Sequence, residues 1–296
     1  MAAIDVRGLR KAYRDTEAVR GIDLSVDEGE VFALLGPNGA GKTTTVEILE
    51  GYRHADAGQV RVLGLDPRRD AGALRARIGI VLQSSGVEQY LTVRETLSMF
   101  SRYYERPRPV EELLELVGLR EKATQRVRTL SGGQQRRLDL ALGLVGDPEL
   151  LFLDEPTTGF DPSARREAWQ LVRDLTSLGT TVLLTTHYME EAAYLARRVA
   201  VMSAGRIVAE GRPDELANRA GSVRVRFDVP LGQEPPRGAE LRGGHYEIVA
   251  EDVARTLHEV TTWALERGVS LQSLEVARPS LEDVYLELTS EAQATA

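Results

Sequence analysis

The stretch Gly-Pro-Asn-Gly-Ala-Gly-Lys-Thr-Thr at residues 36–44 decides the fold. A strand-like apolar run at residues 31–35 leads into it, and a helical pattern over residues 43–49 follows it. Glycine adopts positive φ angles and lets backbone N–H groups approach an anion, and the start of the following helix adds partial positive charge. The spacing therefore predicts a phosphate-binding loop, with the Lys42 ammonium beside the β- and γ-phosphates and the Thr43 hydroxyl toward Mg²⁺. The residues expected to contact the phosphates are Gly36, Asn38, Gly39, Gly41, Lys42, Thr43 and Thr44.

A second glycine-rich segment, Leu-Ser-Gly-Gly-Gln, occupies residues 130–134. Ser131 can cap a helix over residues 132–144, and the two glycines leave the first N–H groups of that helix open to an anion. An ordinary turn before a helix explains such a segment when it stands alone. Beside the loop at residues 36–44, a second phosphate contact is the better interpretation. The residues assigned to this contact are Ser131, Gly132, Gly133 and Gln134.

Two carboxylates, Asp154 and Glu155, directly follow the apolar run at residues 150–153. Such a run indicates a buried parallel strand that delivers acids at its carboxyl end. Phosphoryl transfer to water depends on charge neutralisation and on a group that orients the nucleophile. We therefore expect Asp154 to hold Mg²⁺ and Glu155 to act as general base. The alternative is a strand that simply ends in a solvated acidic turn.

These segments, in this order, make residues 4–215 resemble the ATP-binding subunit of an ABC transporter, whose signature is Leu-Ser-Gly-Gly-Gln. The resemblance implies an α/β fold, the P-loop NTPase core of an ABC ATPase, with a helical subdomain at about residues 84–145. It implies ATP hydrolysis coupled to transmembrane transport, with ATP and Mg²⁺ as ligands. In the family, the signature of one copy closes over the ATP held by the P-loop of a second copy, so the resemblance also implies a homodimer.

Four further site residues rest on this resemblance. Gln83 follows a strand-like run and matches the family glutamine that touches Mg²⁺ and the attacking water. Without the resemblance, a glutamine after a strand is usually just a loop residue. His187 matches the family's switch histidine, which contacts the γ-phosphate. Asp161 corresponds to the loop that crosses the dimer interface, although Phe160 stands where leucine is commoner. Tyr13 is placed to stack on adenine, or else belongs to the core of a first strand.

Composition limits the partners and the location of the protein. The chain has 296 residues, a formal net charge of −8 and no cysteine. Negative charge argues against nucleic acid as a partner, and Arg-Arg pairs such as 136–137 are expected on solvated helix faces. The longest apolar runs are far shorter than the roughly 20 residues of a membrane helix, and the N-terminus does not resemble a signal peptide. We expect a peripheral protein at the cytoplasmic face of the cell membrane, working with separate integral membrane permease subunits.

The character of the chain changes near residue 218. We expect an ABC ATPase domain at residues 1–218 and a small α+β extension at residues 219–296, with strands near 223–229, 245–249 and 271–276 and a helix over 253–267. Residues 278–285 and 157–162 resemble drug-exporter ATPases of the daunorubicin and doxorubicin resistance type. The extension has no convergent set of catalytic residues, so we expect it to brace a dimer or to regulate.

The sequence therefore predicts the ATP-hydrolysing subunit of an ABC exporter. Two copies are expected to dimerise around two Mg-ATP and to drive transmembrane subunits that export a drug, a lipid or another hydrophobic compound. Two alternatives stay open: an ABC importer ATPase, which shares the core motifs, and a non-transport ABC ATPase that acts as a regulatory binding protein.

Overall fold

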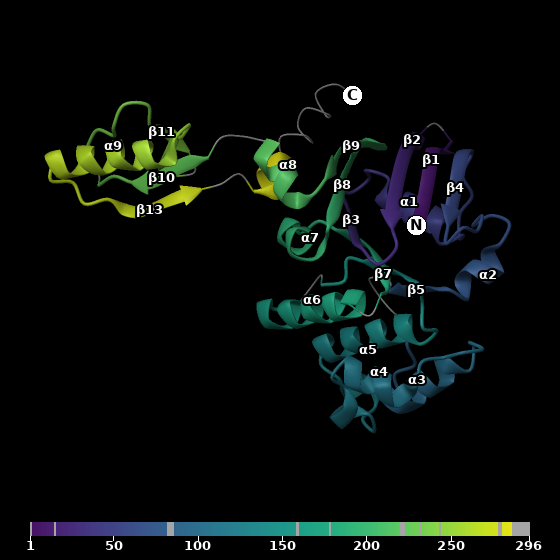
Figure 1. Cartoon of the computed structure of the whole chain (residues 1–296). Coiled ribbons are helices and arrows are strands. Elements are labelled where there is room, and N and C mark those ends of the chain that lie inside the picture. Colours follow the sequence, from purple (N-terminus) through teal and green to yellow (C-terminus); the bar gives the residue numbers. More distant parts are fainter. Residues whose placement is uncertain are drawn as a thin grey trace. The chain divides into compact units, whose positions relative to one another are not determined.

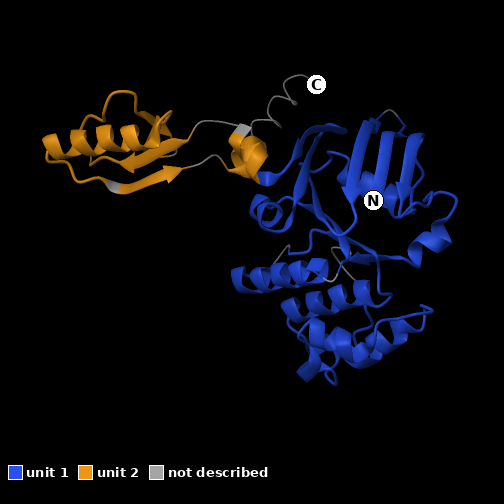
Figure 2. Cartoon of the chain, viewed as in Figure 1, with its two compact units in different colours: residues 1–213, 289–296 blue, residues 214–288 orange. Residues whose placement is uncertain are grey.

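The computed structural model describes residues 2–14, 16–81, 86–157, 160–177, 179–219, 223–230, 233–242, 244–277 and 280–285. The chain forms two compact units, one built on residues 1–213 and the other on residues 214–288 (Figure 2). The domain boundary expected after residue 218 stays a prediction, because compactness does not establish where a segment folds independently.

The larger sheet of the first unit has six strands in the order β5-β6-β7-β3-β8-β9 (Figure 1). Its strands pair in parallel except for β9, which runs antiparallel to β8. Strands β3 and β7 are buried along their whole length, as expected for a parallel sheet covered on both faces. The bounds are β3 Val31–Leu35, β5 Ile78–Val81, β6 Leu150–Asp154, β7 Thr181–Thr186, β8 Arg198–Ser203 and β9 Arg206–Gly211.

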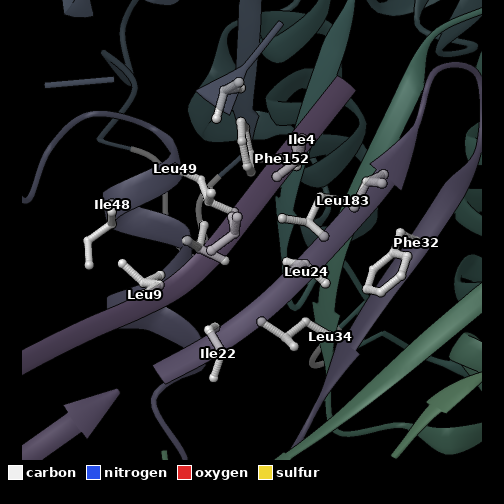
Figure 3. Packing of buried hydrophobic residues seen from close by; sticks show 14 of the residues in the cluster. Ile4, Leu9, Ile22, Leu24, Phe32, Leu34, Ile48, Leu49, Phe152 and Leu183 are labelled. Atoms are coloured by element: carbon white, nitrogen blue, oxygen red, sulfur yellow. The ribbon is translucent and has the colours of Figure 1, made fainter. Parts of the chain in front are cut away.

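A second, antiparallel sheet has the order β2-β1-β4, with β1 at Ala2–Tyr13, β2 at Thr16–Asp27 and β4 at Ala57–Val62. Its apolar face shares one core with helix α1 (Lys42–Leu49) and with the parallel sheet. Figure 3 shows this core, to which Ile4 and Leu24 come from the antiparallel sheet, Leu49 from α1, and Phe32 and Phe152 from the parallel sheet. Helix α1, which follows the phosphate-binding loop, is thus fixed by apolar packing.

Three helices of the first unit lie together in Figure 1. Helices α3, α4 and α5 pack on one another and form the helical part that follows β5. Thr92 and Glu95 form a reciprocal capping box at the start of α3, which satisfies two otherwise unpaired N–H groups. The bounds are α2 Ala71–Arg75, α3 Val93–Ser101, α4 Val110–Leu116, α5 Gly132–Leu144, α6 Pro162–Ser177 and α7 Met189–Leu195, with short 3-10 turns η1 Arg120–Lys122 and η2 Val127–Thr129. Helix α8, at Pro213–Arg219, belongs to the second unit except for its first residue.

The second unit is a four-stranded antiparallel sheet with a helix on one face. The strand order is β11-β12-β10-β13, and Val225 and Phe227 of β10 pack against Val260 of the helix α9. Asp252 caps α9 by accepting a hydrogen bond from the Arg255 N–H. The bounds are β10 Arg224–Asp228, β11 Glu240–Arg242, β12 His245–Val249, β13 Gln272–Ala277 and α9 Val253–Glu266. The predicted fold class, an ABC ATPase core with a small α+β extension, is confirmed.

Among the described residues, no helix is both long enough and apolar enough to cross a membrane.

Glu50, which follows α1, supplies a test of the packing. Its side chain is buried, and burial, together with the negative charges of Asp154 and Glu47, raises its pKa from 4.5 to about 8. Between pH 4.5 and 8 the folded state keeps a proton that the unfolded state releases, so the free energy of unfolding falls as the pH rises through this window.

We therefore expect Glu50→Gln to match the wild type near pH 4.5 and to be more stable at pH 8, by about 2–4 kcal/mol. Urea unfolding of protein free of nucleotide and metal measures the difference. Glu28→Gln, at an exposed position, is the control. Parallel pH profiles for wild type and Glu50→Gln would show that Glu50 ionises normally in the fold.

Candidate active site

The phosphate-binding loop joins the end of β3 to the start of α1, as the sequence predicts. Gly41 stands at the N-cap of α1 with a φ of 102°, and Gly39 has a φ of 80°. A Cβ atom at Gly41 would collide with the Ala18 carbonyl oxygen, and a Cβ at Gly36 with that of Met202. Glycine at 36 and 41 is therefore required by the surrounding backbone as well as by the approach of a phosphate.

The Lys42 side chain folds back onto this loop. Its Nζ donates to the carbonyl oxygens of Gly36 at 2.6 Å and Pro37 at 3.1 Å. Burial lowers the pKa of Lys42, while the negative charges of Glu155 and Asp154 raise it. A phosphate oxygen in place of these neutral carbonyl oxygens would give the buried ammonium an anionic hydrogen-bond partner, which is a stronger one.

The acids predicted for hydrolysis lie at the carboxyl ends of neighbouring strands. Asp154 ends β6 and accepts a hydrogen bond from the Thr185 hydroxyl of β7. Glu155 follows it, and its Oε1 lies 3.1 Å from Nδ1 of His187, which follows β7. Parallel strands that pair in register bring their carboxyl ends to one edge, which explains why residues 32 positions apart meet.

One cleft of about 650 Å³ collects most of the predicted site. Its lining includes the phosphate-binding loop, the two acids and His187. The predicted residues that line it are Tyr13, Gly36, Asn38, Gly39, Gly41, Lys42, Thr43, Thr44, Asp154, Glu155 and His187. Gln83 lies outside the described residues. The hydroxyl of Thr43 and the carboxylate of Asp154 are oxygen donors of the kind that Mg²⁺ prefers, so the donor set fits that ion.

The signature residues lie in a different cleft of the same chain, with a volume of about 1100 Å³. Ser131 caps α5 as predicted: its Oγ accepts from the Gln134 N–H at 3.3 Å, and Gln134 Oε1 accepts from the Ser131 N–H at 3.0 Å. Asp161 and Phe160 line the same cleft. No residue that the structure describes lines both clefts, and the described signature residues of one chain are not part of the site around Lys42.

Tyr13 lies at the mouth of the first cleft with 37% of its surface exposed. Lys11 Nζ lies 5.6 Å from its ring centroid, and the Arg53 guanidinium lies 5.4 Å from it. The ring is therefore partly accessible and is not a core residue. Its stacking on adenine stays a prediction.

Two buried charged residues near the site, Arg136 and Glu191, were not predicted as site residues from the sequence. Arg136 was expected on a solvated face, and that expectation is wrong, because the residue is buried and donates to the backbone beside Glu155. Glu191 of α7 is fully buried and accepts from the Thr157 hydroxyl at 2.7 Å and the Trp169 indole N–H at 2.9 Å. Glu191 thereby ties the segment after Glu155 to α6 and α7. For Glu191 the small and apolar residues that follow it in α7 were an available signal, whereas the polar sequence around Arg136 offered none.

A phosphate-binding loop, strand-end acids and a capped signature helix together define a nucleotide-hydrolysing protein of the ABC class. Residues 19–158 match the family model described as ABC transporter, and residues 223–280 match the model described as ABC transporter domain-containing protein-like, C-terminal domain. The chain belongs to the ATP-binding proteins of ABC transporters.

Relatives span almost the whole chain. It is 42% identical to daunorubicin resistance ATP-binding protein DrrA3 of Streptomyces coeruleorubidus, over 98% of this chain and 96% of that protein. It is 47% identical to Nod factor export ATP-binding protein I of Burkholderia orbicola, over 98% of this chain and 97% of that protein. The expected resemblance to drug-resistance ATPases is thus confirmed.

Solved structures agree with the fold. The structure of cbiO1 from Clostridium perfringens, part of the transporter complex cbiONQ, is 30% identical, with a TM-score of 0.67 over 73% of this chain and 90% of that one. A dimeric ATP-binding cassette, MJ0796 bound to ADP and Pi, is 25% identical, with a TM-score of 0.63 over 71% of this chain and 98% of that one. The protein is an ATP-binding and ATP-hydrolysing subunit of a transporter.

The contacts of Lys42 generate a direct test. We expect Lys42→Ala to weaken ATP binding by roughly 10- to 100-fold, because a charge-assisted contact to two phosphates is lost. Lys42→Arg should also weaken it, since the bulkier planar fork does not fit the place of a compact ammonium. Calorimetric titration with ATP, on variants whose circular dichroism shows a native fold, gives the measurement. Unchanged affinity in Lys42→Ala would contradict the assignment of the loop.

Proposed function

We propose that the protein is the ATPase of an exporter, in which two copies enclose two Mg-ATP and drive separate transmembrane permease subunits. The observation that carries the proposal is the separation of the two clefts. One chain holds the loop, the acids and His187 in one cleft and the signature in another. A second copy, related to the first by a two-fold axis, can bring its signature to the first cleft, and the same axis then makes two equivalent sites.

Within each site, the loop N–H groups and Lys42 hold the phosphates. Thr43 and Asp154, with Gln83, would hold Mg²⁺, which neutralises charge on the phosphate oxygens when bound. The Thr185 hydroxyl fixes the Asp154 carboxylate by donating to it. The Ser131 hydroxyl and the N–H groups at the start of α5 in the second copy would cover the γ-phosphate from the other side.

Glu155 is proposed to orient the attacking water. The water oxygen forms a bond to the γ-phosphorus, the bond from that phosphorus to the β,γ-bridging oxygen breaks, and ADP leaves with that electron pair. The water proton passes to Glu155. His187, whose Nδ1 lies 3.1 Å from the same carboxylate, would hold that carboxylate in place and contact the γ-phosphate.

Export is supported by the relatives and by the extension. The relatives at 42% and 47% identity carry names for drug resistance and for Nod factor export. Residues 223–280 of the second unit match a C-terminal family model, and none of the predicted site residues belongs to this unit. We infer that the cargo is a hydrophobic compound such as a drug or a lipid, that the permease subunits select it, and that the ATPase works at the cytoplasmic face of the membrane.

Replacement of Glu155 by Gln tests the general base. The amide keeps the shape of the side chain but cannot accept the proton, so we expect ATP binding to persist while steady-state hydrolysis falls by at least about 100-fold. Dimers with bound Mg-ATP should accumulate on a sizing column. Hydrolysis at the wild-type rate in Glu155→Gln would remove Glu155 from the chemical step.

Mixing two inactive variants tests whether sites are shared between copies. Ser131→Arg damages the signature, and Lys42→Ala damages the loop. A heterodimer of the two has one site built wholly from undamaged parts and one site with both lesions. We expect the mixture to hydrolyse ATP faster than the sum of the separate variants. Activity equal to that sum would indicate that each chain completes its own site or that both sites must work together.

A further inference from the structure

Glu155 has a backbone conformation that an L-residue rarely adopts. Its φ is 45°, whereas the strand that precedes it is extended. Such a conformation is unfavourable and persists only where neighbouring contacts impose it. On one side, the Glu155 N–H donates to the Thr185 carbonyl oxygen at 3.0 Å, which continues the pairing of β6 with β7. The carbonyl oxygens of residues 154–156 need a hydrogen-bond donor as well.

Arg136 supplies that partner. Its Nε donates to the Pro156 carbonyl oxygen at 3.0 Å, and its Nη2 lies 3.2 Å from the carbonyl oxygen of Asp154 and 3.5 Å from that of Glu155. One guanidinium thus spans three consecutive carbonyl groups around the strained residue. Its Nη1 also lies 3.7 Å from the Asp139 carboxylate, one turn further along α5.

The site of Arg136 is built rather than incidental. The residue is 7% exposed, and its burial lowers the pKa of the guanidinium while the nearby Asp139 and Asp154 raise it. A buried cation is costly unless it is paired and hydrogen-bonded, so the contacts to the backbone have to be kept. Arginine can span several acceptors with a rigid planar fork, whereas lysine offers one point of attachment. The next residue, Arg137, instead reaches Glu167 of α6 from a more exposed position.

We propose that Arg136 is a positioning residue for hydrolysis: it clamps the backbone of residues 154–156 so that the Glu155 carboxylate faces the attacking water. Arg136 lies on α5, the helix that Ser131 caps. The clamp therefore ties the catalytic carboxylate to the helix that carries the signature. This inference rests on the proposed role of Glu155.

The clamp predicts a loss of rate without a loss of binding. A displacement of the reacting group by about 1 Å can lower the rate on the order of 100-fold. We therefore expect kcat to fall about 100-fold in Arg136→Met and about 10-fold in Arg136→Lys. The KM for ATP and the affinity for ATP should stay within about twofold of wild type. Dimers with bound Mg-ATP should accumulate, as in Glu155→Gln. Arg173→Met, at an exposed arginine of α6 that lines neither cleft, is the control, and its kcat should stay within about twofold.

A double-mutant cycle distinguishes positioning from general structural support. Single-turnover hydrolysis is measured for Glu155→Gln with and without Arg136→Met. If Arg136 acts through Glu155, the second substitution adds less than about a twofold loss. If it supports the fold in general, the two losses multiply. Should Arg136→Met unfold on thermal melting, Arg136→Lys takes its place in the cycle.

Several results would overturn the proposal: a normal kcat in Arg136→Lys, a fall in ATP affinity that matches the fall in kcat, or multiplying losses in the cycle. The same experiment separates this inference from the proposed function. If the Arg136 variants hydrolyse ATP normally while Glu155→Gln is inactive, only the proposed clamp is rejected. If Glu155→Gln is active, the assignment of Glu155 as general base is rejected.

Discussion

The structure depends on one constraint: the charge of a triphosphate has to be met at a single edge of a parallel sheet. Strands β3, β6 and β7 lie side by side in register, and their carboxyl ends deliver Lys42, Asp154, Glu155 and His187 to one cleft. The negative charges of Asp154 and Glu155 favour the protonated form of the buried Lys42 at that edge and so offset part of the cost of its burial. The strained backbone of Glu155, the buried contacts of Arg136 and the packing of α1 all fix groups at this edge.

The core explains how the edge is held in place. The antiparallel sheet, α1 and the parallel sheet share one apolar cluster, so a displacement of the phosphate-binding loop would require repacking of residues such as Leu49 and Phe32. Interiors packed at this density resist such shifts. Around the acids the fixing contacts are polar instead: Thr185 holds Asp154, and Glu191 joins Thr157 to Trp169. Rigid apolar support beneath the loop and hydrogen-bonded support around the acids are two solutions to the same problem of orientation.

Much of this was predictable because local chemistry marks it. Glycines at fixed spacing define the loop, and a Ser-Gly-Gly sequence before an apolar helical pattern gives the start of α5 at Gly132, where the structure has it. Strand β12 also has its expected bounds, and α9 begins at the expected Val253.

Arg136 was missed because helical periodicity assigns one polar face, whereas α5 is buried on several sides. Glu50 escaped notice for the same reason: only tertiary packing removes its carboxylate from water. The short strand β11 carries too little pattern to be recognised. The roles of the site residues, the domain boundary and the dimer stay predictions.

The absence of cysteine from the sequence permits the most direct test of the central claim, that the signature of one copy completes the site of another. Copies that carry Asn38→Cys, at the exposed tip of the loop, are mixed with copies that carry Ser131→Cys, both in a Glu155→Gln background with Mg-ATP, under mild oxidation. The shared-site account predicts a disulfide-linked dimer from the mixture, formed only when ATP is present, and none of this species from either variant alone. A chain that carries both cysteines and forms the bond within itself at high dilution, or a mixture that never cross-links although its dimer elutes intact, would contradict it.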